Sequence, residues 1–260
     1  MAGRATRPRA ARGRNASGGA RGSPSARAPR HVVASVEVGG RSVPLTMRTS
    51  PRARRLTLRI DPAEDAVELV LPRGVTMREG LRFAAGKSGW ILTRLTARPP
   101  RVPFAAGAVL PYLGIDHVIR HRPDARGVVW RDGGELHVAG REAHLPRRVG
   151  DWLKSEARRE LSRRASAKAA VIGRRIRRIG LRDPKTRWGS CAPSGVLSFS
   201  WRLVLAPEPV LDYVVAHEVA HLVEPNHGPR FWRLVGQLTP DVDGPRAWLR
   251  RHGHRLLRYG

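Results

Sequence analysis

Two histidines and a glutamate occur within five consecutive residues, at His217, Glu218 and His221. Residues four apart lie on the same side of a helix, so the two imidazoles can bind a single metal ion. Glu218 lies about 100° around the helix from His217. From there its carboxylate can reach a water molecule on the metal rather than the metal itself. The spacing therefore predicts metal-assisted hydrolysis with Glu218 as the general base.

A third metal ligand is expected just after this helix. Pro225 breaks the helix, and His227 follows six residues after His221, so a turn can return a third imidazole to the metal. Glu224 is the alternative, because some zinc peptidases bind their metal through a carboxylate, but it would have to turn back sharply before the proline. Three protein ligands leave a fourth position open, as in catalytic zinc sites, whereas structural sites use four. We therefore predict a zinc site at His217, His221 and His227.

Hydrophobic spacing predicts the elements that must hold these side chains. Residues 211–222 are expected to form the metal-binding helix, anchored in a core by an apolar stripe. Residues 196–206 alternate between apolar and polar types and predict a strand, which Pro207 ends before it opens the helix. Residues 151–178 have a helical composition with a dense arginine face. That face is either an ordinary solvated surface or one that contacts phosphate.

The chain between residues 31 and 149 is mainly strand-like. Period-two alternation predicts strands near residues 32–38, 56–60 and 67–71, and two hairpins over residues 109–119 and 127–138. Residues 77–96 predict a helix that the Pro99-Pro100 pair stops. The core positions expected in that helix are Leu81, Ala84, Ala85, Ile91 and Leu95.

Three segments carry a resemblance to a known family. Residues 217–232 read HEVAHLVEPNHGPRFW, residues 187–191 read RWGSC, and residues 197–203 read LSFSWRL. Together they resemble the YgjP-like (DUF45) metallopeptidase family, which is related to SprT-like zinc proteases and minigluzincins. Weaker similarity occurs at residues 54–60, 87–91 and 110–114, so the resemblance covers about residues 45–255.

The resemblance implies a zincin-like catalytic domain. In that family's pattern the zinc ligands fall on His217, His221 and His227, and the general base falls on Glu218. Combined with the strand and helix spacing, it predicts an α+β protein with a β-rich N-terminal part, residues 31–149, and a helical zincin-like metallopeptidase domain, residues 150–260. Peptides or proteins are the substrates that the resemblance implies.

The chain is strongly basic, with 49 Lys and Arg residues against 21 Asp and Glu residues and a formal net charge of +28. Residues 1–30 contain eight arginines, no acidic residue and little apolar surface, so they are predicted to form a disordered tail. The tail is either a nucleic-acid-binding arm or a solvated extension. The basic surface and the tail together make nucleic acid a candidate partner.

Composition also bears on the cellular setting. No apolar run approaches 18 residues, which excludes a transmembrane helix, and residues 1–30 lack the apolar core of a secretory signal. The single cysteine, Cys191, excludes an intrachain disulfide. We therefore expect a cytoplasmic protein without a membrane partner. Its oligomeric state is left open.

Two other functions compete with the peptidase hypothesis. One is a zinc hydrolase acting on a non-peptide substrate such as a nucleotide phosphoanhydride, which the arginine surplus would suit. The other is a DNA-associated protease or binding module. Tyr213 or an arginine is a candidate second electrophile. Gly189 either permits close approach of a substrate or forms a simple turn, and Cys191 either touches the metal, acts as a redox switch or is a bystander thiol.

Overall fold

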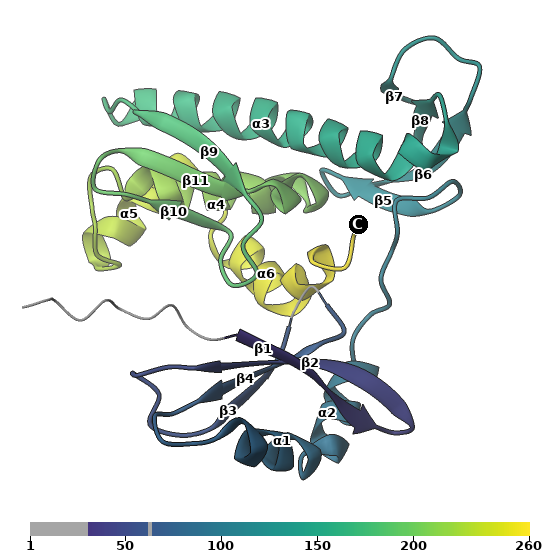
Figure 1. Ribbon diagram of the computed structural model, residues 1–260. Coiled ribbons are helices and arrows are strands. Elements are labelled where there is room, and N and C mark those ends of the chain that lie inside the picture. Colours follow the sequence, from purple (N-terminus) through teal and green to yellow (C-terminus); the bar gives the residue numbers. More distant parts are fainter. Residues whose placement is uncertain (1–30, 62–63) are drawn as a thin grey trace, which may run out of the picture.

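A computed structural model describes residues 31–61 and 64–260, and the predicted tail, residues 1–30, lies outside the described residues. The fold is mixed α+β, as predicted, with sheets in the N-terminal part and the histidine-bearing helix in a largely helical C-terminal part (Figure 1). The elements are β1 (His31–Val38), β2 (Arg41–Thr49), β3 (Thr57–Ile60), β4 (Val67–Leu71), α1 (Met77–Ala85), α2 (Ser88–Thr96), β5 (Val109–Tyr112), β6 (Ile115–Arg122), β7 (Val129–Asp132), β8 (Glu135–Ala139), η1 (Glu142–His144), α3 (Leu145–Val171), β9 (Arg178–Arg182), β10 (Gly189–Cys191), β11 (Val196–Ser200), η2 (Trp201–Leu205), α4 (Glu208–Ala220), α5 (Pro229–Leu238) and α6 (Asp243–Leu256).

The first sheet has the strand order β1-β2-β4-β3 and is covered on one face by α1 and α2 (Figure 1). Thr76 and Glu79 form a capping box that starts α1, with the Thr76 hydroxyl accepting from the Glu79 amide at 3.3 Å. The single helix predicted over residues 77–96 is therefore two helices, separated at Gly86 and Lys87. Ala84 and Ile91 are buried as predicted, but Leu81 and Ala85 are exposed, because α1 buries Gly80 and Ala84 instead.

A second sheet, with the order β5-β6-β8-β7, consists of the two predicted hairpins. Gly133 and Gly134 both have positive φ (52° and 79°), which the two-residue turn between β7 and β8 requires. The parallel pairing of β6 with β8 joins the hairpins into one sheet. Its buried side chains belong to the same core as the C-terminal helices.

Helix α3 organises the second core, and its inner face repeats every fourth residue. The buried residues of that repeat are Leu145, Val149, Leu153, Ala157, Leu161, Ala165 and Ala169. The helix begins at Leu145, so the domain boundary predicted at residue 150 falls inside α3. The two hydrophobic cores divide after α2, and the second core includes Phe104 and Leu110.

The third sheet, β10-β11-β9, leads directly into the helix that bears the histidines. The strand predicted over residues 196–206 ends at Ser200 and continues as the 3-10 helix η2, so its second half was wrongly predicted. The Ser200 hydroxyl accepts from the Arg202 amide at 3.3 Å. The Arg202 guanidinium is buried, where it binds Asp183 and the backbone carbonyls of Leu256 and Tyr259. These contacts turn the chain out of the sheet.

Polar contacts join the two cores. Arg258, which is 4% exposed, binds Asp65 at 3.0 Å and donates to the Pro99 carbonyl at 2.9 Å. Lys185 binds Asp61 at 2.6 Å. Over residues 31–61 and 64–260, no helix combines the length and the apolar character needed to cross a membrane.

Candidate metal centre

Helix α4 carries the predicted catalytic residues through the middle of the second core. It runs from Glu208 to Ala220. It therefore starts three residues earlier and ends two residues earlier than the helix predicted over residues 211–222. His221 is the C-cap residue and keeps helical dihedral angles, φ −65° and ψ −13°, so it still follows His217 on the same side. The buried residues of α4 surround the helix: Val210, Leu211, Tyr213, Val214, Val215, Ala216, Glu218, Val219 and Ala220. Such a helix is fixed by packing on nearly every side.

The structure brings His217, His221 and His227 together. One ring nitrogen from each of the three lies within 4.8 Å of the others, and the Nε2 atoms of His217 and His227 are 3.1 Å apart. His227 comes from the loop between α4 and α5. Ligands at the usual zinc–nitrogen distance in a tetrahedron are about 3.3 Å apart, so the cluster needs little adjustment to hold such an ion.

Burial favours the neutral form of His217 and His221, which is the form that binds metal, and a hydrogen bond fixes the tautomer of His221. The His221 Nδ1 lies 3.0 Å from the Glu224 carbonyl oxygen, which can only accept, so Nδ1 carries the proton and Nε2 has a free lone pair. Burial lowers the pKa of His217 to about 4 and also lowers the pKa of His221. The His217 Nδ1 is buried and has no hydrogen-bond partner within the described part of the chain. The three residues therefore fit a divalent transition metal.

Two aromatic rings from α5 support the cluster. Phe231 is fully buried, and its ring centroid lies 4.9, 4.5 and 4.7 Å from those of His217, His221 and His227. The Trp232 ring lies 5.8 Å from the His227 ring at an interplanar angle of 24°. Sequence spacing did not connect these aromatics with the histidines. Their position ten and eleven residues after His221 was the available signal.

Glu218 lies beside the cluster but is not one of the three clustered donors. Its side chain is buried, and that burial raises its pKa to about 7, partly offset by the positive charge of Arg187. A carboxyl with a pKa near neutrality can both accept and return a proton at physiological pH. The sequence could not have predicted the influence of Arg187, because it depends on how β10 packs against α4.

Gly189, in β10, leaves the space that the Glu218 side chain occupies. A Cβ atom at Gly189 would lie 2.6 Å from both Cγ and Oε1 of Glu218. The sequence suggested that Gly189 forms a simple turn or permits close approach of a substrate. The structure shows a different role, because Gly189 is a strand residue and its neighbour is the candidate base.

Gly189→Ala is expected to slow hydrolysis of any cleaved peptide by about tenfold to a hundredfold, because it displaces Glu218 from its position. Zinc content should not change, since no histidine is touched. Gly180→Ala is the matched control on the same sheet, because a Cβ there would meet Ser198 Oγ at an ordinary 3.6 Å. Equal kcat/KM values for the two variants and the wild type would contradict the positioning role of Gly189.

Burial of Glu218 also has a cost in the metal-free protein that can be measured. Its pKa rises from 4.5 to about 7 on folding, so stability falls as the pH rises through that range. At pH 8, metal-free Glu218→Gln should therefore unfold at a higher temperature than metal-free wild type, with a gain of roughly 3 kcal/mol or less. Below about pH 4.5 the two should converge. Thermal unfolding in chelator tests this, with exposed Glu142→Gln as the control that should show no such gain.

A groove of about 800 Å³ opens onto the histidines and Glu218. Strand β10 and the loop to β11 form one wall, and Arg174 and Arg175 also line it. Cys191 faces the groove as a thiol, because burial and the nearby Glu218 raise its pKa, and it is not part of the metal-capable cluster. Tyr213, a predicted electrophile, does not line the groove and packs in the core.

The alternative third ligand, Glu224, contacts the cluster through its backbone and not through its carboxylate. Glu224 contributes its backbone carbonyl to His221, and its carboxylate is not among the clustered donors of the described residues. His227 therefore completes the cluster, and it is the exposed member of the three.

Comparisons with known proteins identify one family. Residues 54–252 match the YgjP-like, metallopeptidase domain family. A comparison with curated proteins finds no match. Among solved structures, the crystal structure of the metallopeptidase zymogen of Pyrococcus abyssi abylysin is similar at 19% identity and a TM-score of 0.33, over 38% of this chain and 97% of that chain. Because the family match covers well over half of the sequence, this chain belongs to the YgjP-like metallopeptidase domain family.

Proposed function

We propose that this protein is a zinc-dependent peptidase in which His217, His221 and His227 hold the metal. The observation that carries the proposal is the convergence of three imidazoles beside a buried carboxyl, on a groove open to solvent. Three protein ligands suit a catalytic rather than a structural zinc site. When bound, zinc supplies a Lewis acid that polarises a carbonyl group and makes water more acidic.

Glu218 performs the proton transfers in this proposal. In its ionised form it accepts the proton of the water molecule that attacks the scissile carbonyl, and it then delivers that proton to the leaving amine. Its pKa of about 7 in the metal-free protein places it near the optimum for both transfers. A bound cation would lower that pKa and favour the ionised base at neutral pH.

The edge of β10 supports a peptide as the substrate. In the β10-β11-β9 sheet, β10 is an edge strand that pairs with β11, and its residues Gly189, Ser190 and Cys191 line the groove. The backbone groups of an edge strand can pair with an extended peptide, which orients successive residues past the catalytic groups. Nucleotide phosphoanhydrides would not pair with this strand edge. Arg174 and Arg175 line the groove and can bind phosphate, so nucleotides are a useful comparison substrate.

A cleavage assay with metal removal and return tests the proposed function. The zinc-loaded protein is incubated with a quenched-fluorescence peptide library, and separately with nucleoside triphosphates. We expect peptide cleavage that chelation abolishes and added zinc restores, with no phosphate release. Metal-dependent phosphate release without peptide cleavage would instead support the phosphoanhydride hydrolase.

A further inference from the structure

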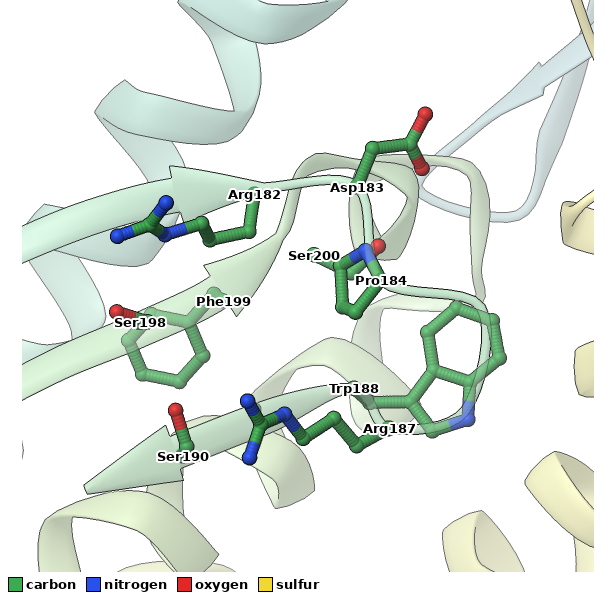
Figure 2. Close-up of a pocket in the computed structure, with 10 residues that line it drawn as sticks. Arg182, Asp183, Pro184, Arg187, Trp188, Ser190, Ser198, Phe199 and Ser200 are labelled. Atoms are coloured by element: carbon green, nitrogen blue, oxygen red, sulfur yellow. The ribbon is translucent and has the colours of Figure 1, made fainter. Parts of the chain in front are cut away.

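A second pocket lies beside the groove, on the β9–β11–β10 sheet, with a volume of about 370 Å³. Its polar lining includes Arg182 in β9, Arg187 before β10, Ser190 in β10 and Ser198 in β11. Figure 2 shows the guanidinium groups of both arginines and the hydroxyl groups of both serines gathered at the same side of the pocket. We call these four residues the Arg–Ser pocket.

The positive charge of this pocket is only partly neutralised by the protein, because the charge of Arg187 acts on the Glu218 carboxyl without forming an ion pair. Its one acidic lining residue, Asp183, binds the Arg202 guanidinium at 2.7 and 3.1 Å and points away from the other charged side chains in Figure 2. Within residues 31–61 and 64–260, neither Arg182 nor Arg187 forms an ion pair with a carboxylate. Two unpaired guanidiniums beside two hydroxyl donors are suited to a group with two anionic oxygens.

The Arg–Ser pocket adjoins the catalytic groove. Gly189 and Ser190 line both, so the two cavities meet at β10. An extended peptide that pairs with an edge strand advances about 3.3 Å per residue and directs alternate side chains to opposite faces. A side chain a few residues from the scissile bond can therefore enter the Arg–Ser pocket while the bond lies beside Glu218.

We propose that the Arg–Ser pocket binds the carboxylate of an aspartate or glutamate side chain in the substrate, and so makes the enzyme selective for acidic peptides. This inference rests on the proposed peptidase function. The size of the cavity favours a peptide over nucleic acid, because it suits one side chain rather than a phosphate backbone that needs a longer track. A net positive groove would also raise the association rate of acidic peptides.

Binding can be measured without hydrolysis, in the zinc-loaded Glu218→Gln protein. Two fluorescently labelled peptide pools are compared by anisotropy, identical except that one carries glutamate and the other glutamine at a fixed position. The glutamate pool should bind roughly tenfold or more tightly, as for a charge-assisted contact. Arg182→Gln with Arg187→Gln should remove that difference. Arg178→Gln is the matched control, because it lies on the same strand without lining the pocket.

The cleavage assay on the wild-type background separates this inference from the proposed function. The ratio of kcat/KM between the glutamate and glutamine peptides should exceed about tenfold and fall toward one in the double variant. Peptide cleavage without any such preference would overturn the Arg–Ser pocket and leave the peptidase intact. Preferential binding with no cleavage would support the pocket and refute the peptidase.

Binding of a labelled oligonucleotide tests the competing hypothesis that the Arg–Ser pocket binds a phosphate backbone. Affinity for it that falls with the same two arginine substitutions, while the two peptide pools bind equally, would overturn the acidic-peptide assignment in favour of a phosphate backbone. We expect instead that any oligonucleotide binding weakens equally in the double variant and in a variant of two arginines outside the pocket, Arg177 and Arg178.

Discussion

Replacing His217, His221 or His227 by alanine is expected to weaken zinc binding by more than about a hundredfold, because each change removes one of three ligands. Among the residues that the structure describes, no fourth histidine belongs to this cluster, so no other imidazole stands ready to replace the one removed. Zinc should raise the melting temperature of the wild type by preferential binding to the folded state. That increase should disappear in each variant.

Metal analysis after dialysis and thermal unfolding with and without zinc measure both effects. Glu224→Ala is the informative control, because only its backbone carbonyl contacts His221 and the alanine variant keeps that carbonyl. His252→Ala, on α6, controls for the loss of any histidine. Normal zinc content in His227→Ala together with loss in Glu224→Ala would show that the carboxylate is the third ligand.

Glu218→Gln should retain zinc and lose roughly a hundredfold to ten-thousandfold in rate. The amide fills the same buried space beside Gly189 but cannot accept a proton. In the wild type, kcat/KM should rise with pH as Glu218 ionises, with the rise lying below pH 7 because the metal lowers the pKa from its metal-free value of about 7. The variant should show no such rise.

The pH profile distinguishes a lost base from a damaged fold. A misfolded variant would lose zinc, and its kcat/KM would be low at every pH. Glu218→Gln should instead keep its zinc content and lose only the rise of kcat/KM with pH. Glu218→Asp provides a second comparison, because it keeps the carboxylate on a shorter side chain. It should recover part of the rate and part of the rise of kcat/KM with pH. A rate for Glu218→Gln close to that of the wild type would mean that another group is the base.

The parts of the fold that were predicted are those governed by local periodicity. A helix was predicted over residues 151–178 from its helical composition, and α3 runs from Leu145 to Val171. The β7–β8 hairpin was predicted over residues 127–138 from its alternation. The strand predicted through residue 206 failed because every residue from Trp201 to Leu205 is buried, and alternation gives no information when both faces are covered. The turn into η2 depends on contacts of Arg202 with residues more than 50 positions away.

In the candidate site, too, the features set by local spacing were predicted and those set by tertiary contacts were not. The four-residue spacing of His217 and His221 encodes their shared side of α4, and the proline after the helix indicated a turn that could return His227. The contact between Gly189 and Glu218 joins residues 29 positions apart, so no local pattern could predict it. The Arg–Ser pocket likewise depends on the register of β9 and β10 against β11, which only the folded sheet defines.

The most direct test of the account is X-ray absorption at the zinc edge on the wild-type protein, with the zinc stoichiometry measured on the same sample. We predict one zinc per chain with three nitrogen ligands from imidazoles at about 2.0–2.1 Å and one further light-atom ligand from solvent. A sulfur ligand at about 2.3 Å would implicate Cys191, and four protein ligands would mean a closed structural site. Either result, or a protein that binds no zinc, would contradict the catalytic three-histidine centre.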